Sequence, residues 1–155
     1  MEIGAEQKAL FRRWPAGVSV VVAEVDGRRI GLTISALVSL SLEPPLVGVA
    51  VARSAALHEL LVEAEEWGVS ILAGGQEQVA RHFARGVPPI AMWTGIAVRE
   101  DDPRLLVGAA AWLVARTVDR VAAGDHSFFV AAIERLEEGR AATSLVYANG
   151  EYRAL

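Results

Sequence analysis

Residues 17–41 read GVSVVVAEVDGRRIGLTISALVSLS, and this stretch decides the fold class. Positions 17–25 are rich in apolar and β-branched residues, which favour a strand. Asp26 and Gly27 form a dipeptide typical of the tight turn that joins two antiparallel strands. A returning strand is expected from Ile30 onward, so the stretch predicts a β-hairpin.

Similar patterns continue on both sides of this hairpin. Helical periodicity predicts three short helices, over residues 4–14, 55–66 and 76–85, the second of them capped by Ser54. Further strands are expected over residues 46–52, 67–73, 110–121, 127–136, 144–147 and 151–155, with a second tight turn at Asn149 and Gly150. Because about six to eight strands follow one another mostly through hairpins, we expect a mainly β fold, a β-barrel with peripheral helices.

Length and composition limit the class of protein. The 155 residues suit one domain, expected to span residues 1–155, since no linker or repeat interrupts them. A formal net charge of −4 argues against nucleic-acid binding driven by charge. The longest apolar run, residues 105–115, is too short to cross a bilayer, and the N-terminus lacks the pattern of a signal peptide. We therefore expect a cytoplasmic protein with neither a nucleic acid nor a membrane as partner.

Few side chains are available for chemistry. The chain has no cysteine, which excludes disulfides, thiol nucleophiles and cysteine–metal sites. Its one lysine, Lys8, lies near an end that we expect to be solvated. The three histidines, at positions 58, 82 and 126, lack the spacing of metal ligands, and the first two are expected on the surface. The motifs of classical dinucleotide folds, P-loop NTPases, α/β-hydrolases and zincins are absent.

One run of hydroxyl side chains stands out from its apolar surroundings. Thr33, Ser35, Ser39 and Ser41 fall at even offsets, so in one continuous strand they would share a face. Such a face, beside unpaired backbone amides, can hold phosphate or ribityl oxygens. The same face can equally be wetted by water, and the residues alone leave both interpretations open.

Two further groups have a functional and an ordinary interpretation. His126 follows Asp125 in a predicted hairpin turn, where it either hydrogen-bonds a ligand or faces solvent. Arg81 and Arg85 project from one side of their helix, either as a phosphate clamp or as part of a solvated face. The four tryptophans are expected mostly in the core, although any of them could contribute to a subunit interface; they are Trp14, Trp67, Trp93 and Trp112.

Taken together, these stretches resemble the flavin reductase family, the NAD(P)H-dependent reductases with an FMN-binding split-barrel fold. The resemblance covers nearly the whole chain and ends in a hairpin over residues 147–155. It is carried, in order, by FRRWPAGV (11–18), GLTISALVSLS (31–41), PPLV (44–47), VSIL (69–72) with Gln76 and Phe83–Ala84, GAAAWL (108–113) and AGDHSFFV (123–130). The fold that it implies is the mainly β split barrel.

The resemblance also implies roles for individual residues. In this family a hydroxyl-rich loop holds the flavin, two residues after it lie against the ring system, and the segment before the second helix suits the phosphate. The implied flavin contacts are Thr33, Ile34, Ser35, Ala36, Ser39, Leu40, Ala52, Arg53, Ser54, Phe83 and Arg85. On the nicotinamide side, the resemblance implies His126 and, on the closing hairpin, Tyr152.

The cofactors and partners are likewise implied by the resemblance. They are FMN, with FAD as the alternative, NADH or NADPH as reductant, a homodimer with flavin near the interface, and a monooxygenase that receives reduced flavin. No catalytic side chain and no metal are expected, because hydride transfer between two cofactor rings needs no general base. Two other interpretations are a non-enzymatic flavin-binding or electron-transfer protein on the same fold, and a structural barrel that has lost its ligand.

Overall fold

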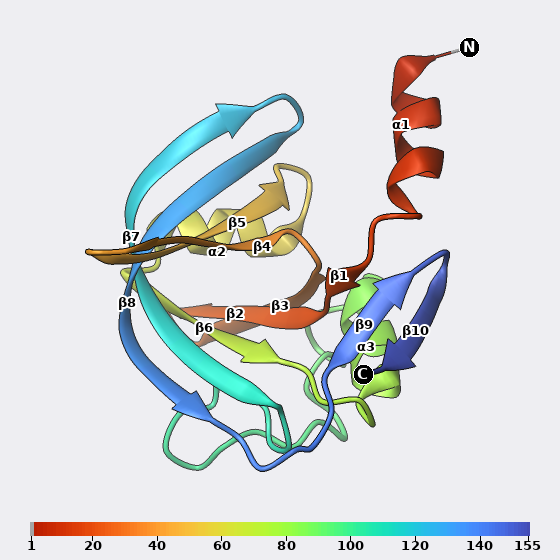
Figure 1. The fold of residues 1–155 in the computed structure, drawn as a ribbon. Coiled ribbons are helices and arrows are strands. Elements are labelled where there is room, and N and C mark those ends of the chain that lie inside the picture. Colours follow the sequence, from red (N-terminus) through yellow and green to blue (C-terminus); the bar gives the residue numbers. More distant parts are fainter. Residues whose placement is uncertain (1) are drawn as a thin grey trace.

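Figure 1 shows the computed structural model, which describes residues 2–155. Its elements are α1 (Ile3–Phe11), β1 (Ala16–Gly17), β2 (Ser19–Val25), β3 (Arg28–Ile34), β4 (Leu37–Leu42), β5 (Pro45–Ala52), α2 (Ala56–Glu63), β6 (Glu66–Ile71), α3 (Glu77–Ala84), β7 (Ala111–Ala123), β8 (His126–Glu138), β9 (Leu145–Ala148) and β10 (Glu151–Ala154). The mainly β fold with three short helices is confirmed. Ten strands are formed among these residues, more than the sequence predicted.

Seven strands form one antiparallel sheet in the order β3-β2-β6-β7-β8-β5-β4, and a smaller sheet has the order β1-β9-β10. The predicted first hairpin is confirmed, because β2 and β3 pair with Val25 opposite Arg28. Asp26 and Gly27 have φ angles of 50° and 79°, the left-handed values that a type I′ turn requires at both central positions.

Residues 33–41 do not form the single continuous strand that would place all four hydroxyls on one face. The strand breaks at Ser35 and Ala36, and the register between β4 and β5 shifts between Ser39 and Ser41. The break has a topological reason, since β3 and β4 lie at opposite edges of the seven-stranded sheet. The chain must therefore cross from one edge to the other at this point, and the sheet curls into a split barrel.

Helix α2 and the two faces of β2 contribute much of the core. Val20, Val21 and Val22 are fully buried, and α2 buries its leucines at positions 57, 60 and 61. Trp67 is also fully buried, and its indole N–H donates to the Thr117 hydroxyl at 2.8 Å.

Trp14, in contrast, is 70% exposed, so its predicted place in the core was wrong. The predicted cap was wrong too, because Ala55 is the N-cap residue of α2 and no side chain caps it.

Gly48 lets two apolar side chains meet above β5. A Cβ atom there would overlap the ring of Phe128 on β8 and approach the Cδ1 atom of Leu40 on β4 to 3.0 Å. These side chains therefore cover the backbone of β5 directly, on a surface that continues into the exposed residues of β4.

Helix α1 lies apart from the rest of the molecule. None of its residues is buried, and Figure 1 shows it extending away from both sheets. The segment that follows is held by a hydrogen bond from the Asn149 N–H to the Arg12 carbonyl. No helix within residues 2–155 is long and apolar enough to cross a membrane.

Candidate functional site

Two adjoining hollows open at the turn between β3 and β4. One, of about 540 Å³, is lined by Lys8, Phe11, Arg12, Trp14, Ala16, Ser35, Ala36, Leu37, Val38 and Tyr147. The other, of about 210 Å³, is lined by Val18, Thr33, Ser35, Ala84, Tyr147 and Tyr152. Because Ser35 and Tyr147 line both, the two hollows form one candidate site with two compartments.

Hydrogen bonds and strand pairing connect three predicted segments. The Arg53 N–H donates to the Asp125 carbonyl, and the Arg53 guanidinium donates to the His126 carbonyl, both at 3.0 Å. Ala52 lies opposite His126 in the pairing of β5 with β8. The Ala36 carbonyl accepts from the backbone of β5 at 3.2 Å. The β3–β4 turn, the β5–α2 loop with the exposed Ser54, and the β7–β8 turn are therefore neighbours, with Ser39 and Leu40 on the adjacent strand β4.

The smaller hollow gathers Thr33, Ser35 and Tyr152. The Thr33 hydroxyl donates to the Ala80 carbonyl of α3 at 2.7 Å, so it is fixed but already engaged. Burial raises the pKa of Tyr152, which keeps its hydroxyl protonated. Arg85 is exposed just beyond the end of α3, and its contact with flavin stays a prediction.

Two of the predicted flavin contacts have side chains that face the core. Ile34 and Phe83 are 5% and 2% exposed. The Phe83 ring packs against Trp93 with the ring centroids 5.3 Å apart. In this arrangement, only the backbone atoms of these two residues could contact a ligand.

His126 and Tyr152 were predicted together on the nicotinamide side, but Tyr152 lines the smaller hollow and His126 lines neither of these two hollows. The ring of His126 is nevertheless held in place, because its Nδ1 atom lies 2.7 Å from Oδ1 of Asp125. The hydrogen bond from His126 lowers the pKa of the Asp125 carboxyl. The contact with Asp125 engages Nδ1 and leaves the Nε2 atom of His126 available for a further hydrogen bond.

The predicted surface positions of the other two histidines were wrong. His58 Nε2 lies 2.7 Å from the Ser127 hydroxyl, and His82 Nε2 lies 2.6 Å from the Met92 carbonyl. Both rings are half-buried because α2 and α3 press these faces onto the body of the protein. Arg81 is also engaged, with a carboxylate oxygen of Glu77 at 2.7 Å.

Tyr147 is a candidate site residue that the sequence reasoning missed. Its ring meets that of Tyr152 edge-on, with centroids 5.0 Å apart, and the two residues are opposite each other in the β9–β10 pairing. The signal was present in the sequence, since a two-residue turn at Asn149–Gly150 pairs position 147 with position 152. The contributions of α1 had no comparable signal.

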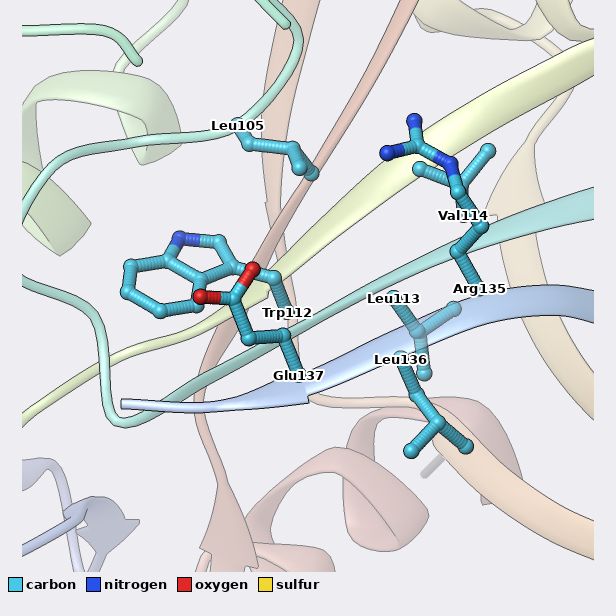
Figure 2. A pocket seen from close by; sticks show the side chains of 7 residues that line it. All are labelled: Leu105, Trp112, Leu113, Val114, Arg135, Leu136 and Glu137. Carbon is cyan, nitrogen blue, oxygen red and sulfur yellow. The ribbon is translucent and has the colours of Figure 1, made fainter. Parts of the chain in front are cut away.

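A separate hollow of about 340 Å³, shown in Figure 2, contains none of the predicted site residues. Its polar groups are already paired. The Trp112 indole donates to the Leu106 carbonyl at 2.7 Å, and Arg135 lies 2.9 Å from Oδ2 of Asp102. Glu137 accepts from Arg99 at 2.8 Å. We therefore place the candidate site at the β3–β4 turn.

The curled seven-stranded sheet, with a two-compartment site where its edges meet, defines the class of split-barrel proteins. The chain belongs to the flavin reductase like domain family, whose model matches residues 11–155.

Similar proteins agree with this membership. The reductase component of 4-hydroxyphenylacetate 3-monooxygenase from Thermus thermophilus is 40% identical over 96% of this chain and 94% of its own. The NADH-dependent FAD reductase of Streptomyces globisporus is 30% identical over 94% and 82%. Among solved structures, the flavin reductase component of a bacterial two-component tryptophan halogenase superposes with a TM-score of 0.87 at 32% identity, covering 98% of both chains.

Proposed function

We propose that the chain passes a hydride from NADH or NADPH to a flavin, which makes it an NAD(P)H-dependent flavin reductase and an oxidoreductase. The relatives that carry this assignment include the NADH-dependent FAD reductase and an NADH:FMN oxidoreductase from Rhodococcus erythropolis. The structural observation that supports it is the exposed Ser35–Ala36 turn, which opens onto both hollows.

The residues around the site fit a flavin. Phe11, Trp14 and Val38 give the larger hollow apolar walls for a ring system, while Ser35 offers a hydroxyl at its edge. At the start of α2, beside Ser54, no side chain caps the helix, so the backbone N–H groups of Ala56 and Leu57 remain available to a phosphate, whereas that of His58 donates to the Ala55 carbonyl. A flavin held in this way supplies the redox chemistry, and the protein binds and orients the two cofactors.

A visible absorption spectrum tests the assignment. The purified protein should bind FMN or FAD, and anaerobic NADH should bleach the flavin absorbance near 450 nm, as for flavins in general. Protein that neither binds a flavin nor oxidises NADH or NADPH with flavin present would contradict the proposal. Yellow protein without nucleotide oxidation would favour the electron-transfer alternative, and colourless protein that ignores added FMN would favour the structural barrel.

His126 is proposed to position the nicotinamide. His126→Ala should raise the KM for NADH about tenfold while the Kd for flavin changes less than about twofold, since one oriented hydrogen bond to the nicotinamide amide is lost. Steady-state kinetics and a flavin titration measure the two effects. Arg28→Ala is the matched control, because Arg28 is also the first residue of a strand after a tight turn. Equal losses in both measurements would refute the assigned role.

We also propose a homodimer whose partner covers α1 and β4. A nine-residue helix with no buried residue is too short to be stable alone in water, where isolated helices need about 12–15 residues. Phe11 and Trp14 are 56% and 70% exposed, and Leu42 on β4 is 85% exposed. The larger hollow lies between these two apolar surfaces, so a second copy would complete its walls.

Leu42→Glu tests the dimer without altering a residue that lines either hollow. Burying a carboxylate at the interface should raise the dimer dissociation constant at least about 30-fold, as for a hot-spot residue. Sedimentation equilibrium measures this constant. Ile90→Glu is the control, because Ile90 is 94% exposed but lies in the loop after α3. A wild-type chain that sediments as a monomer at every concentration would refute the dimer.

Reduced flavin made here would serve a separate oxygenase. Relatives are named as reductase components of 4-hydroxyphenylacetate and 4-nitrophenol monooxygenases, and a solved relative serves a halogenase. A monooxygenase partner is therefore part of the proposed function. One domain over residues 1–155 and a cytoplasmic location stay predictions from the sequence.

A further inference from the structure

A cluster of cationic side chains lies on the face of β8 that packs against α2. Ser127 and Phe129 point to this face, where His58 bonds the Ser127 hydroxyl and meets the Phe129 ring with centroids 5.4 Å apart. Arg120 on β7 is directly opposite Phe129 in the strand pairing, and cross-strand partners share a face. Arg120 therefore stands beside His58, and Arg53 reaches the same place from the β5–α2 loop.

The positive charge here is not neutralised locally. Within residues 2–155, neither Arg53 nor Arg120 has a carboxylate oxygen within ion-pair distance. The nearby Asp125 carboxylate is 95% exposed and bonds His126 instead. Burial lowers the pKa of His58, and the charges of Arg120 and then Arg53 lower it further. His58 is therefore neutral near pH 7 and adds hydrogen-bonding capacity rather than charge.

The two arginines differ in how they are held. The Arg53 guanidinium is fixed by the His126 carbonyl at 3.0 Å, close to Ser54 and the start of α2. Arg120 comes from a different strand, and within residues 2–155 its side chain makes no hydrogen bond, while its backbone N–H donates to the Asp119 carboxylate at 2.8 Å. Arg53 and Ser54 suffice for the single phosphate assigned to them above, so Arg120 is a further cation without a partner.

We propose that Arg120 binds the second phosphate of a dinucleotide whose first phosphate lies at Arg53 and Ser54. This inference rests on the proposed function. Arginine suits the role because its planar fork matches two phosphate oxygens at once. FMN has a single phosphate, whereas FAD and the nicotinamide dinucleotides have two linked phosphates, so only one of these dinucleotides would supply a phosphate to Arg120.

Arg120→Gln tests the proposal, because glutamine keeps polarity and part of the length while it removes the charge. Titrations that follow flavin fluorescence measure the Kd for FMN and for FAD. We expect the Kd for FAD to rise about tenfold, the effect of one charge-assisted hydrogen bond, and that for FMN to change less than about twofold. Arg28→Gln is the control, an exposed arginine in the β2–β3 hairpin.

Steady-state kinetics with NADH on the same variant show which dinucleotide supplies the second phosphate. If flavin binding is unchanged but the KM for NADH rises about tenfold at unchanged kcat, the second phosphate belongs to the nicotinamide dinucleotide, and the site stands. Equal weakening of FMN and FAD, or changes no larger than those of Arg28→Gln, would overturn the proposal. Failure of the wild-type protein to bind either flavin would instead refute the proposed function.

Discussion

Asp102→Ala should lower the free energy of unfolding by about 3 kcal/mol, the lower end of the cost of removing one partner of a buried ion pair, because Arg104 keeps its hydrogen bond to Glu66. Asp102 is 4% exposed, and its carboxylate accepts from the Arg104 side chain at 2.9 and 2.7 Å and from Arg135 at 2.9 Å. Burial raises the pKa of Asp102, but hydrogen bonds from Arg104 outweigh it and hold the pKa below 3.8. The Arg104 side chain is only 16% exposed, so the charge that loses the Asp102 carboxylate stays largely buried.

Urea denaturation measures the loss, provided that the slope of the transition is unchanged. The neighbouring Asp101 is a matched control, because it pairs with Arg99 but its side chain is 54% exposed. Asp101→Ala should cost much less than Asp102→Ala, because exposed ion pairs contribute little to stability. The pKa of Asp102 is lower in the folded protein than in the unfolded chain. Its carboxylate therefore stabilises the fold at pH values above the unfolded-state pKa, and this stabilisation is lost as the pH falls through the folded-state pKa. The two curves, Asp102→Ala and wild type, should therefore converge in strong acid, and a constant difference would contradict the assignment.

Ala36→Trp should weaken flavin binding at least about 100-fold, or about 2.7 kcal/mol. Ala36 is exposed and lines the larger hollow, so an indole would fill space assigned to the flavin ring. Its carbonyl bond to β5 involves only the backbone, and folding should be preserved. A flavin titration and a thermal melt measure the two properties.

Ala91→Trp is the control for Ala36→Trp, because Ala91 is equally an exposed alanine but lies in the loop after α3. It should bind flavin like the wild type. Normal flavin affinity in a folded Ala36→Trp protein would place the ring elsewhere.

The sequence predicted the elements better than their long-range arrangement. Local signals sufficed for the hairpin at Asp26–Gly27, where turn chemistry alone sets the pairing. The break at Ser35–Ala36 was missed because it depends on where β4 finds its partner, β5, at the far edge of the sheet. Even spacing of hydroxyls indicates a shared face only if the strand is continuous.

For the candidate site too, the sequence predicted what depends on local patterns and missed what depends on long-range contacts. Ser35, Ala36 and Arg53 were predicted, and the structure brings their segments together. The sequence does not show in which direction the Phe83 side chain points. In the structure, helix α3 directs this ring toward Trp93 and the core. Tyr147 needed only the register of a two-residue turn, whereas the role of α1 depends on tertiary structure that no local pattern encodes.

The pairing of β1 with β9 has a consequence for how the molecule assembles. Ala16 lies opposite Tyr147, so segments from near opposite ends of the sequence must meet before the wall shared by both hollows exists. Contacts of such long sequence separation carry a large loop-closure cost and form late compared with adjacent hairpins. Capture of a fluorescent flavin during refolding should therefore lag behind the formation of the large sheet, which makes the cofactor a reporter of the last step in the maturation of the chain.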